Sequence, residues 1–216
     1  MALAALSMAA PDTIRFAMHY KQGDKTSYKT HMAMSMGSND VTVDITSSMT
    51  VAKTYDDGGA DLTVEVPKMT INFGGNEVPG HDIPPTTVHV DSTGKITKTD
   101  SQTEQQGVQV RKYATYIFNR DLKVGDVINV DEKDGENHTT GTITLKSVTD
   151  GVATLQADLS ETQPNLEGPM KVSLTMTMDV ASSTLNKMEG TIQNMPTRQG
   201  MPPADNVQVT MEKVTG

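Results

Sequence analysis

The chain of 216 residues contains no cysteine and no tryptophan, and aromatic residues make up only 4% of it. Because cysteine is absent, we expect no disulfide, no thiolate metal site, no cysteine nucleophile and no lipid-modified N-terminal cysteine. Basic residues are also few, with 18 Lys and Arg against 27 Asp and Glu, so the formal net charge is -9. A surface of this charge repels phosphate backbones, and we therefore expect no nucleic-acid partner.

Long apolar runs are absent as well. No stretch reaches the ~18 apolar residues of a membrane-spanning helix, so we expect no transmembrane segment. Residues 1–10 are apolar and rich in small side chains, and Ser7 and Ala9 stand where signal peptidase requires small residues. The basic leader of a signal peptide is missing, and an Ala-rich terminus is the alternative. The pattern predicts a signal-peptide remnant at 1–10 and a periplasmic or secreted protein.

What is abundant favours extended backbone. Thr and Val are frequent, and their branching at Cβ restricts χ1 and suits a pleated sheet. Apolar residues alternate with polar ones over long rows, as at 28–36 and 172–180. Residues 14–20 show the same alternation and predict a strand, whereas the Gly- and Pro-rich stretch 74–85 predicts a loop. Pro67 predicts a bulge that moves the inward face to Met69, Ile71 and Phe73.

One pattern occurs twice. A Gly-Asp turn followed by a strand stands at 23–28 and again at 125–130, and later turns follow in the same order. We therefore predict a single β domain over 11–216, made of related meanders at about 13–100 and 120–216. Apolar residues at 110, 113, 114, 117 and 118 predict a central helix over about 103–118. The expected fold is mainly β, a curved antiparallel sheet or incomplete barrel with that one helix.

Methionine is the most distinctive side chain, with 15 copies. Unbranched thioethers fill irregular space in a core that is poor in aromatic residues. Two alternatives stay open: an apolar cavity lined by methionine, or a Cu(I) site in which His31 joins the thioethers of its strand. The residues we expect to contact an apolar ligand or lipid on the concave sheet are Tyr28, Met32, Met34, Met36, Met176 and Met178.

Motifs of catalysis are missing. The five histidines lack the spacing of a metal pair, and the acidic hairpin tips lack the spacing of a calcium loop. There is no nucleophile elbow, phosphate-binding loop or dinucleotide fingerprint. We predict no catalytic residue, no metal ligand and no cofactor, and we expect a protein that is not an enzyme.

Short motifs carry a resemblance. The segment Lys123-Val124-Gly125-Asp126-Val127-Ile128 follows the predicted helix, and Asp91-x-x-Gly94-Lys95-Ile96 precedes it. A late strand at 176–180 leads through a Ser/Thr-rich turn to 186–191. This arrangement resembles a group of uncharacterised exported bacterial proteins and, in shape, the half-barrels of periplasmic lipoprotein carriers. Those exported proteins carry an aromatic residue where this chain has Ile128. The resemblance implies a non-catalytic envelope protein and no residue roles.

Overall fold

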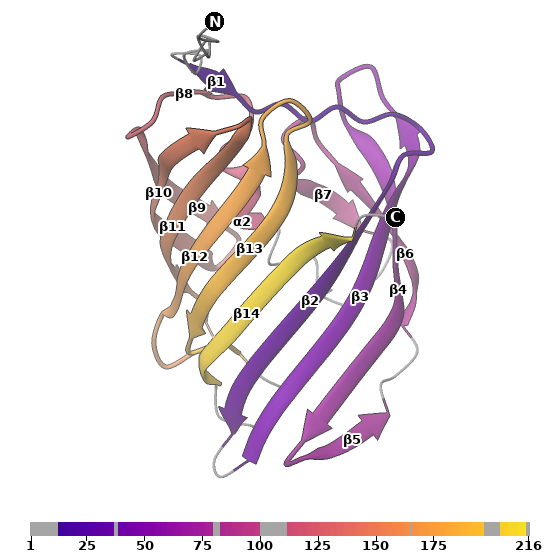
Figure 1. Cartoon of the computed structure of the whole chain (residues 1–216), viewed down its shortest axis with the longest axis vertical. Coiled ribbons are helices and arrows are strands. Elements are labelled where there is room, and N and C mark those ends of the chain that lie inside the picture. Colours follow the sequence, from indigo (N-terminus) through magenta and orange to yellow (C-terminus); the bar gives the residue numbers. More distant parts are fainter. Residues whose placement is uncertain are drawn as a thin grey trace, which may run out of the picture.

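A single curved sheet dominates the computed structural model, which describes residues 13–36, 39–79, 83–99, 112–164, 166–196 and 204–214. The sheet is antiparallel and has 12 strands within these residues, in the order β7-β6-β4-β3-β2-β14-β13-β12-β11-β10-β9, with β5 beside β4. Figure 1 shows that the strands curve around a common inner face. Long strands in a twisted sheet curl in this way. The predicted mainly β, curved antiparallel fold is confirmed.

The first meander occupies one side of the sheet. Its strands follow one another in the chain and pair with their neighbours, except that β5 is a short addition to the far end of β4. The strands are β2 (Lys25–Met36), β3 (Asn39–Thr54), β4 (Ala60–Phe73), β5 (Asn76–Pro79), β6 (Ile83–Val90) and β7 (Ile96–Thr99).

The second meander occupies the other side and is also sequential. Its strands are β9 (Val127–Asp134), β10 (Asn137–Thr149), β11 (Val152–Thr162), β12 (Met170–Asp179), β13 (Thr184–Gln193) and β14 (Asp205–Val214). A separate sheet of two residues per strand, β1 (Ile14–Arg15) and β8 (Asp121–Leu122), lies near its upper end.

The two meanders join where the last strand meets the first long one. β14 pairs antiparallel with β2, with Val209 opposite Met32 and Met211 opposite Thr30. The path therefore ends at β7 on one side and at β9 on the other, and these two strands are not paired with each other in the described residues. The sheet is accordingly an incomplete barrel.

Both meanders start with the same turn. Gly23 and Gly125 have φ values of 90° and 94°, and Asp24 and Asp126 donate backbone N–H bonds back to residues 21 and 123 at 3.0 and 2.9 Å. A positive φ at the third residue of such a bonded turn is typical of type II and favours glycine. The repeated Gly-Asp pattern thus has one conformation, and the descent of both meanders from one ancestral module stays a prediction.

Each turn is also fixed to the next strand in the same way. Gly23 N donates to Val51 O at 2.8 Å and Val51 N returns a bond to Asp24 O at 2.9 Å. In the second meander, Gly125 N donates to Leu145 O at 2.8 Å and Leu145 N returns a bond to Asp126 O at 3.1 Å. β2 and β9 therefore occupy corresponding places.

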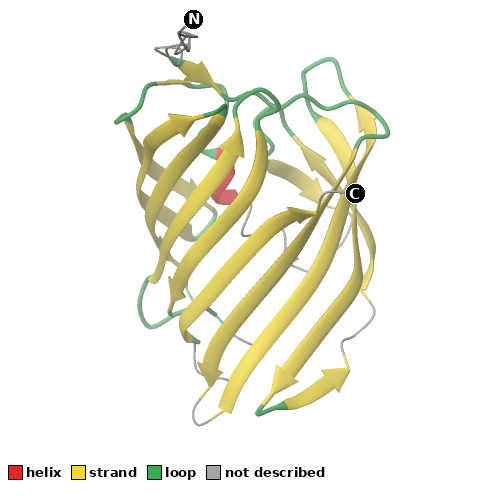
Figure 2. Ribbon diagram, in the orientation of Figure 1, coloured by secondary structure: helices red, strands yellow, loops and turns green. Residues whose placement is uncertain are grey.

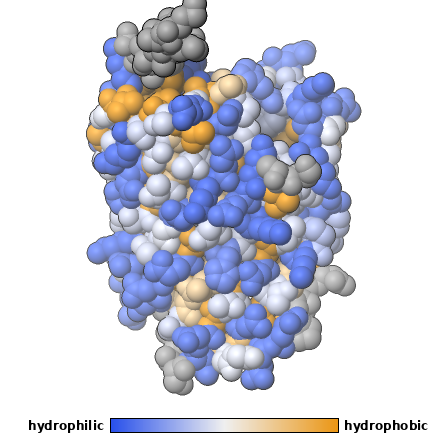
Figure 3. Space-filling view, viewed as in Figure 1, coloured by the Kyte–Doolittle hydropathy of each residue, from blue (hydrophilic) through white to orange (hydrophobic). Residues whose placement is uncertain are grey.

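The inner face holds the hydrophobic core. Alternate residues of β11 and β12 are buried, as the sequence predicts for a sheet with one solvated face. Leu174, Met176 and Met188 have no accessible surface at all. Figure 2 shows the helix inside the curve, behind the front strands. The opposite, outer face seen in Figure 3 is largely hydrophilic, with its main hydrophobic area near β8.

The helix is short within the described residues. α2 covers Lys112–Thr115, and a turn continues to Asn119. Tyr113, Ala114, Ile117 and Phe118 are buried in the core, so the predicted apolar stripe is confirmed over these positions. The rest of the predicted helix, 103–111, lies outside the described residues, as does the predicted signal remnant at 1–10.

Two local predictions are wrong. The strand expected at 14–20 is only Ile14–Arg15, because the groups that follow bond elsewhere: Ala17 N donates to Ser183 Oγ and Phe16 O accepts from Asn119 N. The loop expected at 74–85 contains β5 and the start of β6. Gly74 and Gly75 have φ values of 56° and 83°, which suit a tight two-residue hairpin.

Gly141 tests how closely neighbouring strands approach. A Cβ at this position would lie 2.2 Å from Asp158 O, and its φ is 139°. We expect Gly141→Ala to lower the free energy of unfolding by at least about 2 kcal/mol, because overpacking adds to an unfavourable φ. This corresponds to roughly 4–8 °C in Tm, measured by circular dichroism. Gly135→Ala is the control, since its Cβ would meet nothing within 4 Å; equal losses would contradict the expectation.

Candidate functional site

The structure places most of the predicted ligand-binding residues deep inside the molecule. Tyr28 is 1% exposed, Met176 and Met178 are 0% exposed, and Met32 and Met34 are 8% and 9% exposed. All five belong to one core cluster. The side chain of Met36 lies outside what the structure describes. Their inward orientation is confirmed, and their contact with a ligand stays a prediction.

Near Met176 and Met178 the inner face is filled. Both side chains are 0% exposed, as are Leu174 and Leu155 beside them. Tyr28 donates its hydroxyl to Leu185 O at 3.2 Å, which satisfies a buried polar group. This part of the face is therefore packed core rather than a cavity.

The copper alternative finds no support in the geometry of β2. His31 lies on the outer face, where its Nδ1 is 2.8 Å from Asp44 Oδ1, whereas Met32 and Met34 face inward. The strand does not bring the imidazole and the thioethers to one point. Among the described residues, no group of three or more His, Asp or Glu side chains could hold a metal.

The far end of the first meander is different, because its inner face remains partly open. Phe73 is 41% exposed, Val78 is 43% exposed and Ile83 is 36% exposed. Met69 and Ile71 lie beside them, half-buried against the core. We call these five residues, Met69, Ile71, Phe73, Val78 and Ile83, the inner apolar patch.

The register of the strands places the patch on the inner face. Val41 is opposite Phe73, Ile45 is opposite Met69, and Ile71 is opposite Val78. Ile83 is opposite Val66, which packs against the core. Residues directly opposite each other in an antiparallel pair share a face. Since Val41 and Ile45 are buried in the core, the patch continues the core toward solvent.

Pro67 is the cause of this arrangement. The pairing of β3 and β4 shifts between Thr46 and Ser48, opposite the segment that contains Pro67. The bulge moves the inward positions from Leu62 and Val64 to Met69 and Ile71, as the sequence predicts. Without that shift, the apolar side chains at the end of β4 would lie on the outer face.

Polar and charged side chains gather at a second place, between α2 and the end of the sheet. Lys95, in the turn before β7, donates to Glu132 on β9, so the two ends of the sheet contact each other. Lys112 donates a hydrogen bond to Glu161, which is only 3% exposed. We call the four residues Lys95, Lys112, Glu132 and Glu161, with Tyr113 and Tyr116, the seam cluster.

Hydrogen bonds and burial within the seam cluster shift the pKa values of its residues. The hydrogen bond from Lys95 lowers the pKa of Glu132 and raises the pKa of Lys95 itself. Burial raises the pKa of Tyr113 and of Tyr116, and a hydrogen bond to Glu132 adds to the shift at Tyr116. Both phenols are therefore neutral at physiological pH. The cluster holds the helix against β9 and β11, and its lysines pair directly with its carboxylates.

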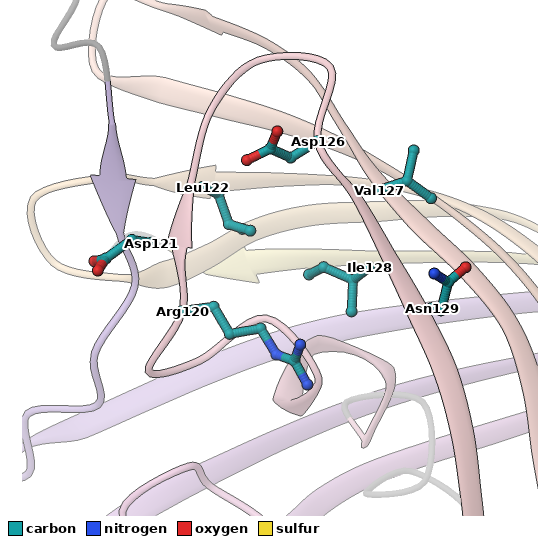
Figure 4. A pocket seen from close by; sticks show the side chains of 7 residues that line it. All are labelled: Arg120, Asp121, Leu122, Asp126, Val127, Ile128 and Asn129. Carbon is teal, nitrogen blue, oxygen red and sulfur yellow. The ribbon is translucent and has the colours of Figure 1, made fainter.

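Two hollows run along β9 next to this cluster. The larger, of about 590 Å3, lies between Arg120, Asp121 and Leu122 on one side and residues 126–129 on the other. Figure 4 shows the Arg120 side chain directed from its loop toward Ile128. The smaller hollow, of about 220 Å3, continues along the same strand to Tyr116 and Glu132.

A third polar group lies on the outer face. Asp61 accepts hydrogen bonds from Tyr55 at 2.6 Å and from His89 at 2.9 Å. The Tyr55 and His89 rings meet edge to face at 5.0 Å, and the bond from Tyr55 lowers the pKa of Asp61. His89 is on the outer side and has a carboxylate partner. Neither hollow described along β9 adjoins these residues.

Sequence reasoning did not single out the inner apolar patch as a site. The signal was present in the parity shift at Pro67, which placed Phe73 inward. What the pattern could not show is that the sheet ends there and leaves Phe73, Val78 and Ile83 uncovered. The seam cluster was also missed, because its members lie far apart in the chain.

Comparison with known proteins gives a loose likeness of fold. No protein-family model matches the chain, and no curated protein sequence matches it significantly. Among the described residues, no helix is both long and apolar enough to cross a membrane.

Three solved structures show the likeness. DynF from the dynemicin biosynthesis pathway of Micromonospora chersina is 10% identical over 99% of this chain and 91% of its own, with a TM-score of 0.28. A putative outer membrane lipoprotein-sorting protein domain from Vibrio parahaemolyticus is 8% identical over 88% and 83%, with a TM-score of 0.23. A DUF1329 family protein from Desulfovibrio piger is 8% identical over 89% and 85%, with a TM-score of 0.25.

The pairing of Lys95 with Glu132 predicts a pH dependence of stability. Because the pKa of Glu132 is lowered in the folded protein, the ionised carboxylate stabilises the fold above the unfolded pKa of about 4.3. That contribution is lost as the pH falls through the lower, folded-state pKa. We expect Glu132→Gln to reduce Tm at pH 7 by about 2–4 °C or less and to flatten the loss of Tm between pH 6 and 3.

Glu136→Gln is the matched control. Glu136 is an exposed glutamate in the turn between β9 and β10, so the substitution removes the same charge without removing the contact to Lys95. Thermal melts of wild type, Glu132→Gln and Glu136→Gln between pH 6 and 3 measure the change in Tm. Parallel curves for wild type and Glu132→Gln would contradict the expectation.

Proposed function

We propose that this protein is a non-catalytic binding protein of the bacterial envelope that holds an apolar ligand or the acyl chain of a lipid on the inner apolar patch. The observation that carries the proposal is the exposure of Phe73, Val78 and Ile83 on the inner face, in continuity with the core. Large apolar side chains gathered at one place on a soluble protein mark a binding surface.

The shape of the surroundings supports a ligand rather than a chance exposure. The face of the molecule seen in Figure 3 is largely hydrophilic, and only 35% of the residues of the chain are hydrophobic. Even so, the exposed apolar residues of the first meander include three on its inner side. Burying a side chain such as Phe73 contributes about 1.5–3 kcal/mol, which a bound acyl chain would supply.

The composition of the patch favours a flexible aliphatic ligand. Met69 is unbranched and adapts its shape to what it contacts, and Ile71, Val78 and Ile83 are aliphatic. Met32 and Met34, predicted from the sequence as ligand contacts, lie at the border between the patch and the filled core. They are the predicted residues best placed to contact a chain that enters from this end.

Charge limits the head group. Asp40 and Glu77 are exposed beside this end of the sheet, and the whole chain carries a net charge of -9. An anionic head group would be repelled. An uncharged or zwitterionic lipid therefore suits the site better than a free fatty acid.

Export and the lack of catalysis are parts of the same proposal. The signal-like residues 1–10 agree with an envelope location. Two polar groups could do chemistry: the seam cluster, and the group formed by Tyr55, Asp61 and His89. The hydrogen bonds within each group join its own members and do not involve the patch. A holder of apolar ligands needs no such groups.

Binding of N-phenyl-1-naphthylamine, an uncharged apolar fluorophore, tests the proposal. We expect its fluorescence to rise on mixing with the protein, and Phe73→Asp to weaken its affinity about tenfold or more, because a carboxylate replaces apolar contact area. Zwitterionic lysophosphatidylcholine should displace the probe at lower concentration than anionic lysophosphatidylglycerol.

Val124→Asp provides the matched control for the test. Val124 is 59% exposed and lies in the turn before β9, outside the patch. The Val124→Asp substitution removes an exposed apolar side chain and adds the same negative charge as Phe73→Asp. Equal affinities of the two variants, or no fluorescence change with the wild-type protein, would refute the proposal.

A further inference from the structure

The edge of the sheet at β9 is the strongest feature that the apolar patch does not explain. β9 pairs with β10 on one side and, among the described residues, with no strand on the other. Its counterpart in the first meander, β2, starts from the same bonded turn but is paired on both sides. The edge of β2 that corresponds to the open edge of β9 is occupied by β14.

The ladder between β9 and β10 shows which groups this edge offers. Leu145 N bonds to Asp126 O, and Ile128 and Val130 follow at the next alternate positions, opposite Ile143 and Gly141. In an antiparallel pair the bonded positions alternate. The N–H and C=O groups of Val127 and Asn129 therefore point away from β10, toward the open side.

This edge lacks the usual protection of edge strands. Proteins commonly cover such edges or place charges and prolines along them. The stretch from Val127 to Val130 has the sequence Val-Ile-Asn-Val and contains no charged residue and no proline. Val127 is 53% exposed. The charged residues of the strand begin only at Asp131.

A hollow adjoins the same stretch. It lies between β8 and β9 and is lined by Arg120, Asp121 and Leu122 on the β8 side. Arg120 makes no ion pair within the described residues, whereas Asp121 pairs with Arg15. The hollow thus combines an unpaired strand edge with one cation that is available to an incoming group.

We propose that β9 receives an extended peptide segment of a partner protein, which adds to the sheet as an antiparallel strand between β9 and β8. Strand addition of this kind takes its affinity from main-chain bonds and its specificity from alternate side chains. An acidic residue of the segment would meet Arg120. The inference is independent of the ligand proposed for the inner apolar patch.

The molecule itself supplies the pattern of the segment. β14 runs antiparallel to β2 and buries Val207, Val209 and Met211 on the inner side, with polar residues between them. A segment on β9 would place its alternate apolar side chains beside Ile128 and Val130, which are each 6% exposed and face inward. Its polar side chains would lie outside with Val127 and Asn129.

A synthetic, fluorescein-labelled peptide with the sequence of residues 205–214 is the probe. We expect saturable binding by fluorescence anisotropy and slower exchange of the β9 amides on addition of the peptide. Asn129→Pro should weaken the affinity about tenfold, because proline removes an outward donor. The ladder to β10 does not use that donor. Asn129→Thr retains the N–H and should bind like the wild type.

Each outcome decides the proposal. A peptide methylated on alternate backbone nitrogens should not bind, since it cannot form the ladder. Equal binding by Asn129→Pro and Asn129→Thr, with both variants folded by circular dichroism, would refute strand addition at β9 and indicate exchange with β14 on β2. Absence of binding at millimolar peptide would also overturn the inference.

Discussion

The pairing of β14 with β2 is the constraint on which the rest of the structure depends. It joins two sequential meanders into one sheet, and it brings Val209 and Met211 of the last strand beside Met32 and Thr30 of the first long one. These residues are separated by most of the chain, so their contact requires closure of a very long loop. We infer that this ladder forms late in folding, after the local hairpins of each meander, because local contacts cost less entropy.

Methionine makes this junction possible in a protein with few aromatic residues. Met32, Met176, Met178, Met188 and Met211 belong to one core cluster together with the strands of both meanders. Strands that twist and bulge leave irregular gaps, and an unbranched side chain with several rotatable bonds fills them. The zero exposure of Met176, Met178 and Met188 shows how closely these gaps are filled. The thioethers therefore need no metal to account for their number.

Local patterns predicted most of the fold. The alternation at 28–34 and 172–178 gave the correct inward faces, and Pro67 gave the parity shift that places Met69 inward. The Gly-Asp pattern predicted a repeated turn, which the structure forms with the same bonds. The error at 14–20 has a different cause. Alternation cannot show whether a backbone will find a ladder partner, and Phe16 and Ala17 bond to Asn119 and Ser183, which are distant in sequence.

The candidate sites were harder to predict because they arise from what the sheet leaves uncovered. Whether Phe73 is buried depends on the elements that face it, and no pattern within β4 contains that information. The same holds for β9, whose sequence resembles that of an ordinary internal strand. Only the order of pairing shows that it stands at the end of the path. Buried partners such as Glu161 and Lys112 likewise meet through tertiary structure alone.

The helix α2 covers the inner face of the two meanders unequally, and this difference bears on both candidate sites, the inner apolar patch and the edge of β9. The contacts of α2 and the turn after it go to Glu161 on β11, to Glu132 on β9 and to Phe16, so the helix covers the inner face on the side of the second meander. The far end of β4 and β5 receives no such cover from α2, and its apolar side chains stay exposed. Exposed ion pairs contribute little, so the contact of Lys95 with Glu132 is too weak to close the sheet by itself. Among the described residues, β7 and β9 do not pair with each other, so the edge of β9 stays unpaired.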